Sequence, residues 1–272
     1  MRPLTERLVL DRKADDMFVG RPAPEPARIY GGEVAALALA ATNRTVDGDR
    51  RAHSLQAMYL RAGDASDDVE FTVERLRDGR SFSSRQVTAW QQGRPIFVAL
   101  VGYHVDDDGF EHDRPMPEAP SPETLEAISS VGWVPGQAWI DWAGKQTDVE
   151  MRWVPPVLGD PSGRRLFWFR VPGTEDADGA LQSALAVFVS DFTMVASIRL
   201  PHEPPDRKLY LMTTLNHTVY LHRPFESSQW HLIEHSSHVA AGSRGTSIAY
   251  LYRQDGALVA TFVQEGLARR IE

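Results

Sequence analysis

Two stretches of the chain are apolar on almost every side of the helix that each would form. The first runs from Gly32 to Thr42 and consists mainly of Val, Leu and Ala. The second runs from about Asp178 to Ser190 and has larger side chains at the same kind of positions. A helix that is apolar all round is buried on most sides rather than lying on a surface. The pattern predicts one buried helix in each half of the chain.

After each helix the apolar positions change to a period of two or to short runs. These patterns, separated by turn residues such as Asp78-Gly79, are typical of antiparallel hairpins. The predicted strands are Val69 to Glu74, Ser81 to Trp90, Ile96 to Tyr103, Thr246 to Arg253 and Leu258 to Gln264.

The final hairpins of the two halves form an internal repeat. They are displaced by 163 positions throughout, so that Gly93 in the turn of the first corresponds to Gly256 in the second. A repeat of this kind indicates two related structural units. We therefore predict an α+β fold with two modules, each an antiparallel sheet wrapped around a buried helix, which describes the hot-dog module. The expected boundaries are residues 1–104, an acidic and proline-rich linker at 105–124, and residues 125–272.

Composition excludes several classes of protein. The formal net charge is −8 and no basic cluster occurs, which argues against binding to nucleic acid or to an anionic membrane. No run of about 18 apolar residues predicts a membrane span, and the N-terminal residues lack the apolar segment of a secretory signal. The absence of cysteine excludes disulfides and thiolate chemistry, which fits a cytoplasmic protein.

Motifs for the commonest hydrolases and cofactors are missing. There is no Gly-x-Ser-x-Gly pentapeptide, and no phosphate-loop or dinucleotide fingerprint, so we expect no cofactor. His231 and His235 on a strand would lie about 13 Å apart, too far to share a metal ion. We interpret them as solvated strand residues, the acidic run Asp106 to Gly109 as part of a solvated linker, and expect no metal site.

The two repeats differ at three positions that carry polar chemistry. Asp191 ends the second helix where the first offers Asn43 or Arg44, and Gln264 replaces the apolar Val101. Thr214 has no hydroxyl partner in the first half. A carboxylate, a hydroxyl and an amide are sufficient to hold and deprotonate a water molecule beside an ester-like carbonyl. Taken singly, each also suits an ordinary helix-end or strand residue, and both interpretations stay open on these grounds.

A series of motifs in order over nearly the whole chain resembles the acyl-CoA thioesterase II family, whose members are double hot-dog proteins. The motifs are Arg28 to Val34, His53 to Asp64, Arg77 to Arg85, Ser190-Asp191-Phe192, Leu215 to Thr218, His222 to Phe225, and Asp255 to Gly266.

The resemblance implies an acyl-CoA hydrolase of fatty acid metabolism that releases free fatty acid and coenzyme A. It assigns activation of the hydrolytic water to Asp191, Thr214 and Gln264. Backbone N–H groups of Gly31, Gly32 and Glu33 are expected at the oxyanion. His53, Arg61 and Arg80 are expected to bind substrate, the two arginines equally suiting strand-end salt bridges. Asn216 and Glu33 depart from the family pattern, which commonly has Asp and Gln there, and so bear on activity and substrate preference.

Two other functions remain as alternatives. A non-catalytic acyl-CoA-binding protein would show the same motifs. A hot-dog hydratase or dehydratase would carry a histidine five residues after the aspartate, where this chain has Ala196. The C-terminal residues lack a peroxisomal address, so the expectation is a bacterial-type cytoplasmic enzyme that associates as a homo-oligomer through its sheets. The sequence gives neither acyl-chain preference nor pathway.

Overall fold

The computed structural model describes residues 2–23, 27–127, 148–155, 164–202 and 210–271. The chain forms two compact units, and neither is continuous in sequence. Unit 1 comprises Met1–His112, Asp176–Asp191 and Asn216–Phe225; unit 2 comprises Asp113–Glu175, Phe192–Leu215 and Glu226–Glu272. The module boundaries expected from the sequence stay a prediction, because residues 176–191 and 216–225, from the second half of the sequence, belong to unit 1.

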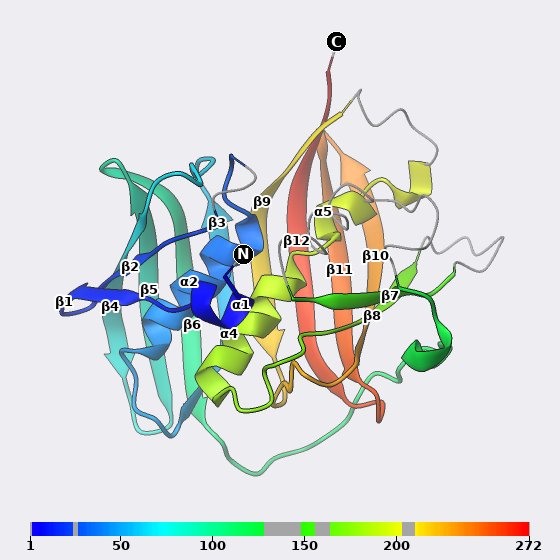
Figure 1. Ribbon diagram of the computed structural model, residues 1–272, viewed down its shortest axis with the longest axis horizontal. Helices are drawn as coiled ribbons and strands as arrows, with labels where there is room; N and C mark the ends of the chain where they lie inside the picture. The colour runs from blue at the N-terminus through cyan, green and yellow to red at the C-terminus, as the bar shows by residue number, and fades with distance from the viewer. Residues whose placement is uncertain (1, 24–26, 128–147, 156–163, 203–209, 272) are drawn as a thin grey trace. The chain divides into compact units, whose positions relative to one another are not determined.

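Unit 1 is an antiparallel sheet with helices against it (Figure 1). The strands lie in the order β1-β2-β4-β5-β6-β3, followed by the second half of β9, and helix α2 packs against β3, β4, β5 and β6. Its elements are α1 Leu4–Arg7, β1 Asp11–Ala14, β2 Met17–Gly20, α2 Gly31–Asn43, β3 Arg50–Tyr59, β4 Val69–Asp78, β5 Phe82–Gln91, β6 Arg94–Val105, α4 Gly179–Ser190 and residues 216–221 of β9 Tyr210–Leu221.

Helices α2 and α4 are buried as the apolar pattern predicted, and they pack against each other within unit 1. Ala36, Leu37 and Leu39 of α2 and Leu185 and Phe188 of α4 are all inaccessible to solvent. By length and composition, Gly179–Ser197 is the one described stretch that would also suit a membrane span, but 56% of its apolar window is buried. Burial of this kind is typical of the core helix of a folded domain.

Unit 2 is a second antiparallel sheet, in the order first half of β9, β12, β11, β10, β8 and β7. The short helix α5 packs against β10, β11 and β12. Its elements are η1 Pro122–Thr124, β7 Glu150–Trp153, β8 Arg165–Arg170, α5 Met194–Ser197, η3 Leu200–His202, residues 210–215 of β9, β10 His231–Ala241, β11 Arg244–Arg253 and β12 Leu258–Arg270. The strands predicted for both halves are confirmed.

The acidic, proline-rich segment is only partly solvated. Asp106 to Gly109 are exposed, as expected. Further along, Arg114 pairs with the buried carboxylate of Glu234 at 2.5 Å, and the indole N–H of Trp168 donates to the carbonyl of Pro120 at 2.9 Å. Met116 and Ala119 also pack on the buried cluster around Trp168. The solvated-linker interpretation is therefore wrong for this later stretch, which covers apolar side chains of unit 2.

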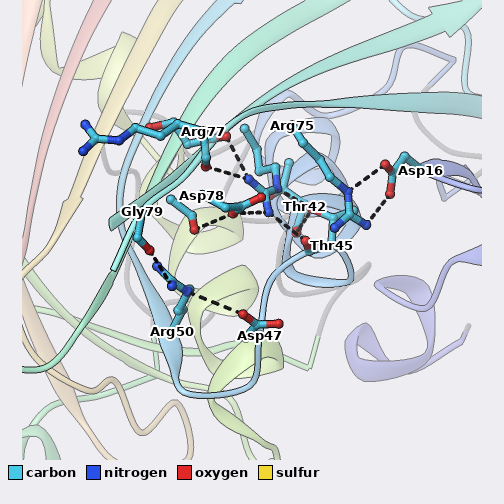
Figure 2. Close-up of polar contacts among 12 residues, drawn as sticks. Asp16, Thr42, Thr45, Asp47, Arg50, Arg75, Arg77, Asp78 and Gly79 are labelled. Carbon is cyan, nitrogen blue, oxygen red and sulfur yellow. Dashed lines mark hydrogen bonds and ion pairs between the residues drawn. The ribbon is translucent and has the colours of Figure 1, made fainter. Parts of the chain in front are cut away.

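The end of helix α2 is held by a network around Arg85, whose side chain is 1% exposed. Figure 2 labels Thr42, Thr45 and Asp78 of this network. The Arg85 guanidinium donates to Thr45 Oγ1 at 3.0 Å and to Asp78 Oδ1 at 2.7 Å. Nearby, the phenol of Tyr103 donates to Thr42 Oγ1 at 2.6 Å. Because a buried guanidinium needs all its donors satisfied, this network fixes α2 on β4, β5 and β6.

Three histidines of the second half are buried rather than solvated. His217, His231 and His235 are each inaccessible to solvent, whereas His222 and His238 are exposed as expected. Burial lowers the pKa of His217 and of His235 to about 3, and mainly burial lowers that of His231 to about 4. The sequence interpretation of His231 and His235 was therefore wrong, and all three imidazoles are neutral at pH 7.

Candidate active site

Asp191 lies where the C-terminus of α4 meets the N-terminus of α2, both in unit 1. It is the C-cap of α4 and directly follows Ser190, the last residue of that helix. Its carboxylate oxygen Oδ2 accepts the backbone N–H of Gly32 at 2.9 Å. The first N–H groups of a helix have no partner inside the helix, and the helix dipole makes this end favourable for an anion. The α2 terminus therefore holds the carboxylate in one orientation and stabilises its charged form.

Two adjacent glycines make this approach sterically feasible. A Cβ atom on Gly31 would lie 2.8 Å from Oδ2 of Asp191, and one on Gly32 would lie 2.5 Å from the carbonyl oxygen of Phe188. Real Cβ atoms essentially never come so close to another heavy atom. Gly31 thus leaves room for the carboxylate, and Gly32 allows α4 to approach α2.

Two tyrosine phenols also lie close enough to Asp191 for its charge to affect them. Tyr59 donates its hydroxyl to the carbonyl of Gly31 at 2.9 Å, and Tyr30 donates to that of Phe188 at 3.0 Å. Burial, with the negative charge of Asp191 as the second cause, raises the pKa of both phenols well above the usual value. Both therefore stay protonated and brace the two helix ends.

Thr214 and Gln264 are joined to each other within unit 2. Thr214 lies on the first half of β9, and Gln264 lies on β12 with its side chain inaccessible to solvent. The amide nitrogen of Gln264 donates to Thr214 Oγ1 at 2.5 Å. Since the amide donates to the threonine oxygen, the hydroxyl proton of Thr214 is directed away from Gln264 toward an acceptor.

Two of the three backbone N–H groups expected at the oxyanion already donate to protein acceptors in the structure. That of Gly32 is occupied by Asp191, and that of Glu33 donates to the carbonyl of Tyr30 at 3.1 Å. An oxyanion role for Gly31, Gly32 and Glu33 stays a prediction, while orientation of Asp191 is the observed role of Gly32.

The carboxylate of Glu33 belongs to a buried ion pair. It contacts the guanidinium of Arg7 at 2.9 Å, both side chains being 1% exposed, and it also accepts the backbone N–H of Ala23 at 3.2 Å. Burial raises the pKa of Glu33, and the charge of Arg7 opposes that shift. In this structure Glu33 ties the N-terminal segment to the first turn of α2.

The remaining predicted substrate-binding residues lie on other parts of unit 1. His53 on β3 packs edge-on against the rings of Phe82 and His104, and burial lowers its pKa. Arg61 donates to the backbone carbonyl of Pro95 at 2.6 Å. Arg80 is exposed between β4 and β5. Substrate binding by these three residues stays a prediction.

Sequence reasoning assigned no role to Tyr30, Tyr59 or Ser190, although each lies inside a motif that carries the family resemblance. A signal for Tyr30 was present in Tyr30-Gly31-Gly32, where an aromatic hydroxyl precedes two residues without side chains. Among the described residues, no three His, Asp or Glu side chains come together as metal ligands would.

The arrangement around Asp191 is suited to general-base chemistry. One carboxylate oxygen is fixed by the N–H of Gly32, and a carboxylate held in one orientation can act as a proton acceptor. Separately, within unit 2, Thr214 has a hydroxyl whose oxygen accepts a hydrogen bond from the buried amide of Gln264. Fixed acceptors and donors of this type are the elements of water activation.

Comparisons with known proteins give a consistent family. Residues 20–104 match the model of the acyl-CoA thioesterase N-terminal domain, and residues 116–268 match that of the C-terminal domain. Acyl-CoA thioesterase 2 of Haemophilus influenzae is 32% identical over 278 residues, covering 98% of this chain and 96% of that protein.

Solved structures agree with this relationship. The acyl-CoA thioesterase II TesB2 of Mycobacterium marinum has a TM-score of 0.82 and 30% identity, with 98% of each chain covered. A protein of unknown function with a hot-dog fold from Alicyclobacillus acidocaldarius has a TM-score of 0.79 at 18% identity and covers both chains fully. The fold of this chain is therefore a hot-dog fold.

Proposed function

We propose, because this chain belongs to the acyl-CoA thioesterase II family, that it hydrolyses acyl-CoA with a water molecule activated by Asp191, Thr214 and Gln264. Thioester hydrolysis itself follows from the family: the chain is an acyl-CoA thioesterase. The assignment of the three residues is our proposal. So is the finer architecture, a double hot-dog with modules at 1–104 and 125–272.

In the proposed mechanism Asp191 acts as the general base. Its carboxylate takes a proton from water while the water oxygen attacks the thioester carbonyl carbon. The resulting tetrahedral oxyanion collapses, the carbon–sulfur bond breaks, and the sulfur leaves as a thiolate that takes up the proton held by Asp191. The products are a carboxylic acid and coenzyme A, and no covalent acyl-enzyme forms. Thr214 and Gln264 orient the water in this scheme.

The observation that carries the proposal is the bond from the Gly32 N–H to Asp191, made at a helix N-terminus that two glycines leave open. A carboxylate used only to end a helix would not need a second helix terminus opposite it. The bond fixes the carboxylate before substrate arrives, so that no reorganisation is required during the reaction.

Release of free thiol from acyl-CoAs of different chain length tests the proposal. Asp191→Asn keeps the shape but removes the base, so kcat is expected to fall by about 100-fold or more. Asp178→Asn is the matched control, because Asp178 begins the same helix, accepts the N–H of Leu181 at 2.8 Å, and asparagine begins helices equally well. An Asp191→Asn enzyme as active as the control would refute the general-base assignment. A wild type that binds acyl-CoA without turnover would instead be the non-catalytic binding protein.

Thr214→Val and Gln264→Leu test the proposed role of these two residues. Each removes one partner of the hydrogen bond between them, and kcat is expected to fall by about 10- to 100-fold in either variant, since a positioned donor is lost. The double variant should be no worse than the more severe single variant, because both changes remove one unit. Additive losses would show that the two residues act separately.

We also propose a homo-oligomeric, cytoplasmic enzyme of bacterial type. Support for association comes from three large side chains on adjacent strands of unit 1: Met58 on β3, Leu100 on β6 and Tyr220 on β9 are 50%, 47% and 41% exposed. Sedimentation of the wild type and of Leu100→Glu tests this, and a monomeric wild type at micromolar concentration would refute it. Cell fractionation tests the location.

A further inference from the structure

The residues on either side of Asp191 are each hydrogen-bonded to a buried histidine. Ser190 comes directly before Asp191 and Thr193 comes two residues after it. Ser190 is bonded to His217 within unit 1, and Thr193 is bonded to His235 within unit 2. Both imidazoles are inaccessible to solvent. Neither histidine has a part in the mechanism proposed above.

The donor and the acceptor of the bond between Ser190 and His217 can be assigned. The hydroxyl of Ser190 donates to the carbonyl of Val187 at 2.7 Å, and its oxygen lies 2.7 Å from Nε2 of His217. Since the serine proton is used on Val187, the imidazole is the donor, and its proton lies on Nε2. His217 is on β9, opposite Ala57 of β3. The bond therefore attaches the last residue of α4 to the strand that also carries Thr214.

The bond on the following side stabilises an unusual backbone conformation. Thr193 has a φ of +61°, in the left-handed region that a β-branched residue rarely adopts. Its Oγ1 lies 2.9 Å from Nδ1 of His235, and Oγ of Ser197 lies 3.3 Å from the same nitrogen. Ser197 donates its own proton to the carbonyl of Thr193 at 3.0 Å. Nδ1 of His235 is therefore within hydrogen-bonding distance of both hydroxyl oxygens.

A strained residue persists only where its surroundings hold it, and such residues are concentrated at functional sites. A turn required merely to connect α4 with α5 would be satisfied by glycine or asparagine at position 193 without this cost. The two histidines are also unsuited to charge chemistry, because burial lowers the pKa of each to about 3 and keeps the imidazoles neutral. Neutral imidazoles with fixed protons are suited to holding hydroxyl groups in place.

We propose that His217 and His235, acting through Ser190 and Thr193, are positioning residues that hold the Asp191 turn in its reactive geometry. This inference rests on the proposed role of Asp191 as general base. His217 sets the end of α4 that precedes the carboxylate, and His235 holds the left-handed turn that follows it. Both histidines act on the backbone beside Asp191 and not on substrate.

The test compares removal and conservative replacement of each bond. Ser190→Ala and His217→Leu are expected to lower kcat by about 10- to 100-fold with KM changed by less than about two-fold, since a displacement near 1 Å is enough for such a loss. The double variant should fall no further than the worse single one. His217→Gln keeps a donor near the position of Nε2 and should recover most of the rate. On the other side, Thr193→Val should lose rate and Thr193→Ser should retain it.

Tyr103→Phe is the matched control. It removes a buried hydroxyl that is hydrogen-bonded to Thr42 and Asn43 at the end of α2, the corresponding helix of the first half, which is followed directly by Arg44 and not by an aspartate. It should lower the melting temperature as the Ser190 and His217 variants do while leaving kcat unchanged. If those variants lose stability like the control but keep kcat, the positioning role is refuted.

Asp191→Asn in the same panel separates the two hypotheses. Full activity of the Asp191→Asn variant would refute the proposed role of Asp191 as general base. Loss of activity there, together with full activity in Ser190→Ala and Thr193→Val, would leave the general base intact and overturn only the positioning role. Thr193→Val also gives an independent result if a His217 variant does not fold.

Discussion

Replacement of Gly32 by alanine would force apart the two helices that carry the candidate site. The added Cβ would lie 2.5 Å from the carbonyl oxygen of Phe188 and 2.6 Å from the ring of Tyr30. Ordinary contact begins at 3.4 Å, so about 0.9 Å of separation must be gained. The atom of Phe188 belongs to the backbone and cannot rotate away, so the end of α4 itself must move.

The cost of this movement follows from packing and from the geometry of the base. Overpacking of a close-fitting interior costs about 1–3 kcal/mol. For a chain of this size that lowers the melting temperature by roughly 2–4 °C per kcal/mol. The 2.9 Å bond between the Gly32 N–H and Asp191 is also lost or stretched. A shift near 1 Å at a catalytic group reduces kcat by about 100-fold.

The neighbouring glycine gives a sharp contrast. A Cβ on Gly31 would meet Oδ2 of Asp191 at 2.8 Å and the ring of Tyr59 at 3.2 Å, both of them side-chain atoms that can yield. Gly31→Ala should therefore change stability by less than about 1 kcal/mol while lowering kcat by about 10-fold or more, because the carboxylate is displaced. Of the two adjacent positions, one should affect mainly activity and the other both activity and stability.

Gly179→Ala is the control for both variants. Gly179 begins α4, and nothing lies within 4 Å of its added Cβ. Removing a helical glycine should stabilise the protein by up to about 1 kcal/mol and leave kcat unchanged. Thermal unfolding and initial rates of thiol release at saturating acyl-CoA, well below the melting temperature, measure the two effects. Wild-type activity in Gly31→Ala, or wild-type stability in Gly32→Ala, would refute the close approach of Asp191 and α4 to α2.

Three further predictions concern stability. Arg85→Met should cost about 3 kcal/mol or more in urea unfolding, because the buried network at the end of α2 loses its donors; a loss below about 1 kcal/mol would contradict this. Arg114→Lys should cost about 1–2 kcal/mol, since an ammonium cannot bond both oxygens of Glu234, and an unchanged melting temperature would count against that pairing. Because the pKa of His235 is lowered in the fold, the unfolded chain gains a proton at this residue below about pH 6.5 while the folded protein does not. The free energy of unfolding should therefore fall by about 2 kcal/mol per such histidine between pH 7 and 5. His235→Gln should show a correspondingly smaller fall, and a fall equal to that of the wild type would show that His235 is not neutral in the folded protein.

Local patterns in the sequence determined the elements of this fold. Helices α2 and α4 are apolar on every side, and that pattern alone requires burial. The hairpins were readable from period-two alternation and from turns such as Gln92-Gly93, where both residues adopt positive φ. The internal repeat and the ordered motifs identified the family before any coordinate was known. These features depend on residues close together in the chain, which is why sequence reasoning could reach them.

Burial of the histidines was decided by tertiary structure. Every residue from His231 to His235 is buried, so both faces of β10 are covered at that point. Part of the cover comes from Met116 and Ala119, which pack on the cluster that contains Leu232. Alternation along a strand shows only the preferences of that strand, and it cannot show that a distant proline-rich segment lies over its outer face.

The sequence identified candidate residues of the site, whereas the tertiary structure determined their contacts. The sequence by itself singled out Asp191, Thr214 and Gln264 through the difference between repeats, and the family resemblance gave them a chemistry. Only the tertiary structure decided that the Gly32 N–H faces Asp191, that Gln264 donates to Thr214, and that a buried histidine holds Ser190 and another holds Thr193. Each of these contacts joins residues dozens of positions apart or more. Their geometry depends on how helices and strands pack, which no local pattern of hydrophobic and polar residues records.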